Sequence, residues 1–205
     1  MVFTRGFKGR PREDEATRSR VPPGQYVTAD FPVLTAGPTQ HTSLDDWTLS
    51  MQVAGRLLAK WSWHDFGMLR QTGITTDIHC VTKWTKLDTR WRGVTFDDLL
   101  RAAGLDAAPA AFVTVHCDGG YSTNVPVADL VAGKAMVATH FDELPLSPTH
   151  GGPARLLVPH LYFWKSAKWI RRIEFREQDS PGFWESLGYH IHGDPWREQR
   201  YDGDP

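Results

Sequence analysis

The chain has 205 residues and a net charge of −1, and 40% of its residues are hydrophobic, with nine tryptophans. This length and apolar content fit one sizeable soluble globular domain. The balanced charge excludes a whole-protein nucleic-acid footprint. Membrane insertion is not expected either, because no apolar run approaches the roughly 20 residues that span a bilayer.

The first 24 residues are charged and rich in Arg, Gly and Pro. Such a segment buries little apolar surface, so we expect a flexible arm over 1–24 and a folded domain over 25–205. The N-terminus lacks the apolar core of a signal peptide, which favours a cytoplasmic protein.

Periodicity predicts a mixture of short strands and helices in chain order. Residues 47–53 alternate apolar and polar side chains, which indicates a strand, 63–66 resemble a helical turn, and 74–81 form a second strand. Residues 95–104 predict a helix, because Thr95 suits its N-cap and Gly104 its C-terminal end. A short helix is expected over 127–132, and strands over 111–117, 135–140, 155–158 and 169–175. The predicted fold class is α+β, a single domain of mixed sheets with short helices.

Residues 77–94 combine a cysteine with a basic segment. Cys80 ends a predicted strand, and four basic residues follow it in an expected loop: Lys83, Lys86, Arg90 and Arg92. Nearby positive charge lowers a thiol pKa and favours the thiolate, which binds soft metals. The alternative is a buried core cysteine beside a solvated loop.

Histidines suggest a zinc site as an alternative. His-Cys dipeptides occur at 79–80 and 116–117. Neighbouring strand residues point to opposite faces, however, and the C-x-x-C spacing of structural zinc sites is missing. His190 and His192 fit one face of a strand, or two surface positions in a polar tail.

Residues 150–168 carry a second candidate site. Two glycines at 151 and 152 permit close backbone approach to a ligand. Arg155 offers a bidentate fork and Lys168 a point charge for a phosphate group. The alternative is a Gly-Pro turn that leads into a strand.

Taken together, these segments resemble the sulfite oxidase superfamily, whose members have a molybdopterin-binding oxidoreductase domain. The resemblance rests on T-D-I-H-C before the basic segment, W-T-K-L-D-T-R-W-x-G-V, G-G-P-A-R-L-L-V-P and K-S-A-K-W-I-R-R-I. The chain looks most similar to bacterial cytoplasmic sulfite-oxidase-like proteins and to the catalytic subunit of methionine sulfoxide reductase.

The resemblance implies a molybdenum cofactor bound through molybdopterin. Cys80 falls at the position of the thiolate ligand to the metal, and Arg155 at that of the arginine that holds the pterin's phosphate. His150 stands where the sulfoxide-reductase relatives have an Asn. The other implied cofactor-binding residues are Leu34, Thr35, Thr114, Ser166, Ala167 and Lys168.

The implied activity is two-electron oxygen-atom transfer on a small S- or N-oxide or a sulfite-like anion. Lys83 and Arg90 are expected beside Cys80 as catalytic residues that stabilise anionic charge, and Trp84 and Trp164 as pocket walls. The expected partners are a small-molecule substrate and an unidentified electron-transfer partner. Two alternatives remain: a molybdopterin-binding module without turnover, and a zinc hydrolase.

Overall fold

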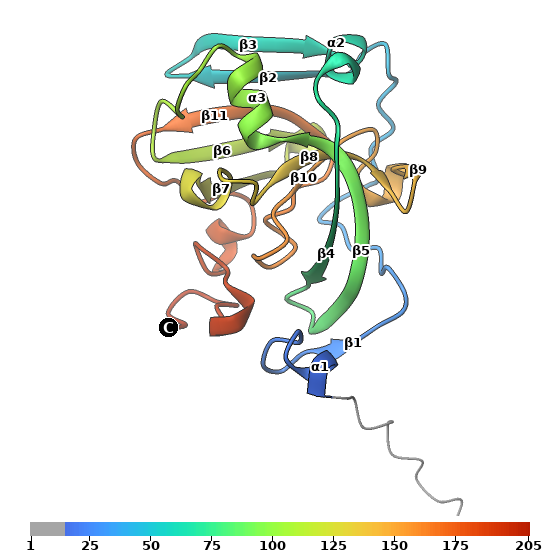
Figure 1. Cartoon of the computed structure of the whole chain (residues 1–205). Helices are drawn as coiled ribbons and strands as arrows, with labels where there is room; N and C mark the ends of the chain where they lie inside the picture. The colour runs from blue at the N-terminus through green and yellow to red at the C-terminus, as the bar shows by residue number, and fades with distance from the viewer. Residues whose placement is uncertain (1–14) are drawn as a thin grey trace, which may run out of the picture.

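The computed structural model describes residues 15–205 and consists of two sheets and a few short helices (Figure 1). In the first sheet, β5 (Trp84–Thr95) and β8 (Met136–Phe141) are central. β1 (Tyr26–Val27) and β4 (Thr72–His79) pair with β5, while β9 (Leu144–Pro145) and β10 (Arg155–Leu157) pair with β8. The α+β prediction is confirmed.

The second sheet has the order β3-β2-β11-β6-β7. Its strands are β2 (Thr48–Val53), β3 (Arg56–Ser62), β6 (Phe112–Cys117), β7 (Ser122–Pro126) and β11 (Ile170–Arg176). β11 runs parallel to β2 and antiparallel to β6, so a late strand joins two early hairpins. The helices are α1 (Glu15–Arg18), α2 (Trp63–Met68) and α3 (Phe96–Ala102).

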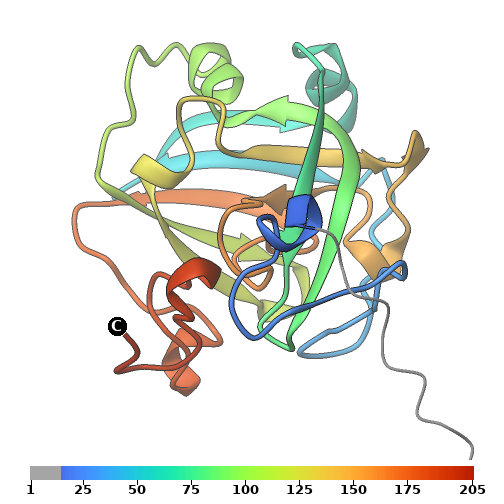
Figure 2. The same ribbon diagram turned by 60° about the horizontal axis from the view of Figure 1, so that its bottom comes forward.

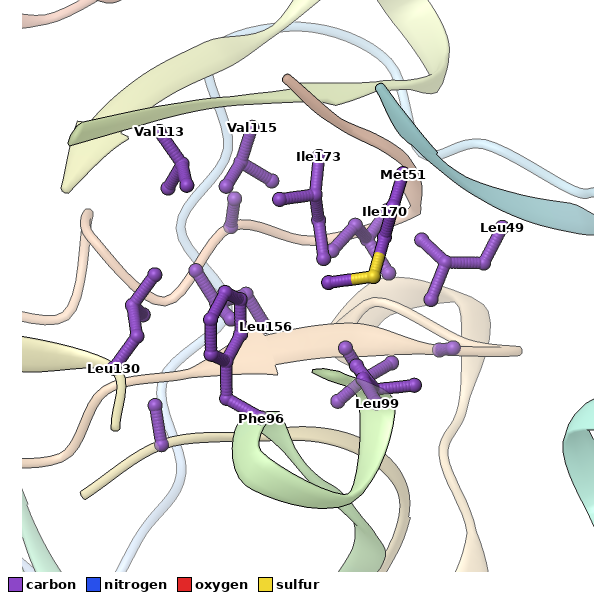
Figure 3. Close-up of a cluster of buried hydrophobic side chains, with 14 of the residues drawn as sticks. Leu49, Met51, Phe96, Leu99, Val113, Val115, Leu130, Leu156, Ile170 and Ile173 are labelled. Carbon is purple, nitrogen blue, oxygen red and sulfur yellow. The ribbon is translucent and has the colours of Figure 1, made fainter. Parts of the chain in front are cut away.

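The main core lies between the second sheet and α3. Figure 3 shows Met51, Val113 and Ile173 directed toward Phe96 and Leu99 on α3, and all five side chains are at most 1% exposed. The helix begins where the sequence predicts, because the Thr95 hydroxyl accepts a hydrogen bond from the Asp98 backbone N–H.

The predicted basic loop after Cys80 is a strand. Residues 84–95 form β5, the longest strand of the described chain, and pair with β4 as a curved hairpin (Figure 1). The pairing with β8 shifts register at Gly93, where an added Cβ would lie 2.1 Å from the Val137 carbonyl oxygen. Only glycine permits this close approach, and such a bulge bends the strand.

The described part of the predicted arm contacts this hairpin. Arg20 Nε donates to Asp77 Oδ2 at 2.9 Å, and the same guanidinium pairs with Asp88. Residues 1–14 lie outside the described residues. Within 15–205, no helix is long and apolar enough to cross a membrane. The predicted helix at 127–132 is a 3-10 turn over Val127–Asp129, and β3, β7 and the short strands β1 and β9 were not predicted.

Candidate functional site

Cys80 lies in the tight turn that joins β4 to β5. The turn is closed by hydrogen bonds from Cys80 N to the Trp84 carbonyl (2.8 Å) and from Lys83 N to the Cys80 carbonyl (2.9 Å), and Lys83 adopts a positive φ of 76°. The thiol is buried, with Cys80 7% exposed, and its Sγ accepts a hydrogen bond from the Thr82 hydroxyl at 3.2 Å. Cys80 lines a cavity of about 320 Å³.

The surroundings of this thiol differ from the expectation. Burial raises the pKa of Cys80, and the cation that opposes this effect is Arg200 from the C-terminal segment. The predicted lowering by Lys83, Lys86, Arg90 and Arg92 is therefore wrong. Their positions explain why: side chains alternate along a strand, so Arg90 and Arg92 are exposed while Trp91 between them is buried.

The two basic residues expected to be catalytic lie outside the cavity. Arg90 forms a surface ion pair with Asp142, with Nε 3.2 Å from Oδ1, and Lys83 is exposed and does not line the cavity. The cavity geometry therefore gives their predicted catalytic role no support. Trp84 and Trp164, expected as pocket walls, both line the cavity.

Arg155 places a buried positive charge on the cavity wall. It is 2% exposed, its guanidinium lies 4.2 Å from the Phe163 ring centroid, and it donates hydrogen bonds to the carbonyls of His150 and Ser166. No carboxylate in the described chain pairs with it. Burial lowers the pKa of Arg155 to about 9. A buried cation without a counter-ion is costly, so this site favours an anionic ligand.

Lys168 adds a second cation beside Arg155. Its Nζ donates to the Thr149 carbonyl at 2.9 Å, and burial together with the nearby Arg155 lowers the pKa of Lys168 to about 8. Gly151 has a φ of 102°, and a Cβ there would lie 3.0 Å from the Lys168 side chain and 3.1 Å from Arg155 Cβ. Glycine thus lets the loop pass close to the aliphatic parts of both side chains.

The remaining predicted cofactor residues fall into two groups. His150 stacks on Phe31 with ring centroids 4.0 Å apart and lines the cavity. The other members of this first group, which also line the cavity, are Leu34, Thr35, Ser166 and Ala167. Thr114 does not line it: it lies on β6, with a buried hydroxyl that has no hydrogen-bond partner in the described structure. Cys117 is a buried free thiol.

One wall of the cavity was not predicted from the sequence. Residues 177–205, which follow β11, form a C-terminal segment. Its residues Phe183, Trp184 and Tyr189 line the cavity, beside Trp164. The Tyr189 ring lies 5.3 Å from that of Trp164 and 5.0 Å from that of Trp184. The aromatic run at 183–184 was the available signal, but the segment has no periodicity that would indicate which way it packs.

One of the two tail histidines, His192, contacts an acidic side chain that it shares with His160. His192 and His160 each place Nε2 3.0 Å from a different oxygen of Asp129. Across residues 15–205, no group of three or more His, Cys, Asp or Glu side chains is placed to hold a metal ion. The zinc-hydrolase alternative therefore finds no ligand set in the described structure.

These features define a class of protein, an α+β domain that binds an anionic organic cofactor beside a buried cysteine. The unpaired charge of Arg155, the glycine loop over Lys168 and the thiol in the same cavity suit a phosphate-bearing metal cofactor that takes a sulfur ligand. Residues 36–184 match the model of the oxidoreductase molybdopterin binding domain. The chain belongs to this family, whose cofactor is molybdenum held by molybdopterin.

Relatives agree with this assignment. The chain is 40% identical to an uncharacterized oxidoreductase of Bacillus subtilis, YuiH, over 97% of its own length and all of the relative's. It is 26% identical to a candidate protein-methionine-sulfoxide reductase subunit of Azospira oryzae. That match extends over 83% of the present chain and 66% of the Azospira protein. The sulfite oxidase of Gallus gallus is 24% identical over 92% of the chain, which spans 41% of that enzyme.

A solved structure shares the fold. The sulfane dehydrogenase SoxCD of Paracoccus pantotrophus superposes with a TM-score of 0.59 at 17% identity, covering 86% of this chain and 56% of that one. The recognition of the sulfite oxidase superfamily from sequence motifs is confirmed.

Proposed function

We propose that this protein catalyses two-electron oxygen-atom transfer at a molybdenum centre ligated by the Cys80 thiolate. The observation that carries the proposal is the presence of the Cys80 thiol and the unpaired Arg155 guanidinium in one cavity. A thiolate is a ligand for a soft metal, and a guanidinium is a partner for a phosphate. A single cofactor that carries both a metal and a phosphate would therefore find a suitable partner for each in this cavity.

Different residues of the cavity bind different parts of the cofactor. Arg155 and Lys168 hold the phosphate by charge-assisted hydrogen bonds, while Ser166 and Ala167 supply the adjoining backbone. Cys80 donates its sulfur to the metal. When bound, the cofactor supplies a two-electron couple between molybdenum +6 and +4 and the oxygen-atom transfer itself.

The walls around Cys80 favour an uncharged substrate. The neighbouring cavity surface is formed by Trp84, Phe163, Trp164 and Tyr189. Among the described residues that line the cavity, Arg155 and Lys168 are the sole Lys or Arg side chains, and both are assigned to the phosphate. A neutral S-oxide or N-oxide with an apolar substituent fits these aromatic walls better than a sulfite-like anion.

Reduction of such an oxide consumes two electrons and two protons and releases one water. The electrons come from an external electron-transfer protein. The aromatic walls exclude bulk water from the reacting atoms.

The test begins with the purified protein. We expect stoichiometric molybdenum by mass spectrometry of the metal and a fluorescent oxidised pterin after acid extraction. With reduced methyl viologen, we expect turnover of methionine sulfoxide or trimethylamine N-oxide, and little oxidation of sulfite with ferricyanide. Molybdenum without turnover of any of these would favour a binding module, rapid sulfite oxidation would refute the substrate class, and zinc without pterin would refute the proposal.

A further inference from the structure

The turn that carries Cys80 is held from outside by the two ends of the chain. Gln25 Nε2 donates to the Cys80 carbonyl at 3.1 Å, and Arg200 Nη1 donates to the Val81 carbonyl at 2.7 Å. Both residues lie outside 36–184, the part of the chain that matches the family model. We call Gln25 and Arg200 the turn donors.

Contacts with neighbouring residues fix the position of Arg200 beside the turn. Its side chain is 11% exposed, and its guanidinium lies 5.0 Å from the Tyr162 ring centroid. Its backbone N–H donates to Asp204 Oδ2 at 2.8 Å, and its carbonyl accepts from His190 N at 3.2 Å. In Figure 2 the C-terminal segment, in red, folds back on itself, and these contacts give Arg200 a defined position within it.

Gln25 is fixed in a similar way from the N-terminal side. Its Oε1 accepts a hydrogen bond from the Thr85 hydroxyl at 3.1 Å, and that hydroxyl lies 3.0 Å from His79 Nδ1. The amide therefore spans the turn, with one contact to the carbonyl of Cys80 and one to the start of β5. The backbone of Tyr26 reinforces this placement by donating to the Lys83 carbonyl at 2.9 Å.

The turn needs such support because of its place in the fold. It is the tip of a long hairpin, it contains a residue with positive φ, and the hydrogen bond given to the thiol comes from Thr82 in the turn itself. A ligand sulfur has to be held in one orientation, and groups that hydrogen-bond around metal ligands fix that geometry.

We propose that Gln25 and Arg200 are positioning residues that hold the Cys80 turn in the geometry in which its sulfur meets the metal. The two chain ends thereby complete the metal site of the family domain. This inference deepens the proposed function, because it assumes that Cys80 is the ligand.

The test compares four variants of the full chain in the loaded enzyme. Arg200→Met and Gln25→Met remove each donor at similar side-chain length, Arg200→Lys restores one donor with the charge, and Arg197→Met is the control. Arg197 is an exposed arginine of the same segment, and no hydrogen bond or ion pair of its side chain occurs in the described structure. For Arg200→Met and for Gln25→Met we expect a broadened or shifted Mo(V) paramagnetic resonance signal. We also expect kcat to fall roughly tenfold or more, with KM little changed.

A second readout needs no cofactor. In full-length protein from a host that cannot make molybdopterin, iodoacetamide labelling is followed by mass spectrometry at Cys80, with the buried Cys117 as internal reference. Loss of one turn donor should raise Cys80 labelling relative to Cys117 roughly fivefold, as expected when a local opening loses one net hydrogen bond. Arg200→Lys should fall between wild type and Arg200→Met, and Arg197→Met should match wild type.

The outcomes separate this inference from the proposed function. Unchanged spectra and unchanged Cys80 labelling in both Met variants overturn the positioning role. Parallel increases at Cys80 and Cys117 also overturn it, because they show general unfolding. If the wild-type protein carries no molybdenum, or if Cys80→Ser leaves its spectrum unchanged, the proposed function fails, whereas the labelling ratio still decides whether the donors hold the turn.

Discussion

Lys165 and Glu185 form an ion pair that is shut off from solvent, with Nζ 2.6 Å from Oε1 and side chains 0% and 1% exposed. Lys165 Nζ also donates to the side-chain and backbone oxygens of Asn124, and Glu185 Oε1 accepts from the Trp164 indole N–H at 2.9 Å. Because Glu185 belongs to the C-terminal segment, this pair joins that segment to the cavity wall beside Trp164.

Removing one partner of this pair should be strongly destabilising. Lys165→Met leaves the Glu185 carboxylate buried and uncompensated, which typically costs about 3–5 kcal/mol. Urea unfolding at neutral pH would measure this loss. The double variant Lys165→Met with Glu185→Leu removes both charges and should recover part of the stability. Additive losses in the double variant would contradict an energetically coupled pair.

The contact of His192 with Asp129 predicts a pH dependence of stability. The hydrogen bond to Asp129 raises the pKa of His192 above its ordinary value of 6.5. Burial alone would raise the pKa of Asp129, but hydrogen bonds from His160 and His192 outweigh it and hold that pKa well below its ordinary value of 3.8. The His192 contribution is therefore complete below pH 6.5 and lost as pH rises through the raised pKa. The Asp129 contribution is present above pH 3.8 and lost in strong acid.

The measurement is the difference in melting temperature between wild type and His192→Gln at two pH values. We expect a clear difference at pH 5.5 and a smaller one at pH 9. An equal difference at both pH values would show that the charge on His192 adds nothing to the docking of the segment.

Local patterns predicted the elements that have a clear period. The alternation in residues 47–53 and the cap residue Thr95 led to β2 and α3, because these signals act over a few residues. β5 was missed because Arg90, Arg92 and Gly93 resemble a solvated loop. The buried residues Thr89, Trp91 and Gly93 alternate with the two arginines, and this pattern was the available signal.

The candidate site was less accessible to sequence reasoning. Family motifs led to Cys80, Arg155 and Lys168, which the fold brings into one cavity. The motifs carried no information on Tyr189 and Arg200, because irregular segments pack through long-range contacts that no local period reflects. The charge near Cys80 was misjudged for a related reason: strand geometry, rather than proximity in sequence, decides which side chains face the thiol.

Arg155→Met should weaken cofactor retention more than it weakens the fold. Losing a charge-assisted hydrogen bond to phosphate costs about 1.5–3 kcal/mol, whereas removal of an unpaired buried charge also removes its desolvation cost. Molybdenum and pterin content after dialysis measures retention, and the melting temperature of the cofactor-free chain measures the fold. Arg92→Met, at an exposed position of β5, is the control. Full occupancy in the Arg155 variant after dialysis would show that this arginine does not hold the phosphate.

Cys80→Ser tests the metal ligand directly. Serine is nearly the same size, but its hydroxyl rarely ionises near neutral pH and its oxygen is a harder donor than sulfur. The substitution should therefore remove the sulfur–molybdenum bond and abolish oxygen-atom transfer. Part of the pterin should remain, because the proposed phosphate partners Arg155 and Lys168 act independently of the thiol.

The matched control is Cys117→Ser, at the second buried free cysteine. Burial, together with the charge of Asp118, raises the pKa of Cys117, as expected for an inert core thiol. Its replacement should lower stability modestly and leave the Mo(V) spectrum unchanged. Both variants are compared with wild type by Mo(V) paramagnetic resonance and by viologen-linked turnover. Wild-type turnover in Cys80→Ser would refute the ligand assignment, and a loss confined to Cys117→Ser would transfer it to the other cysteine.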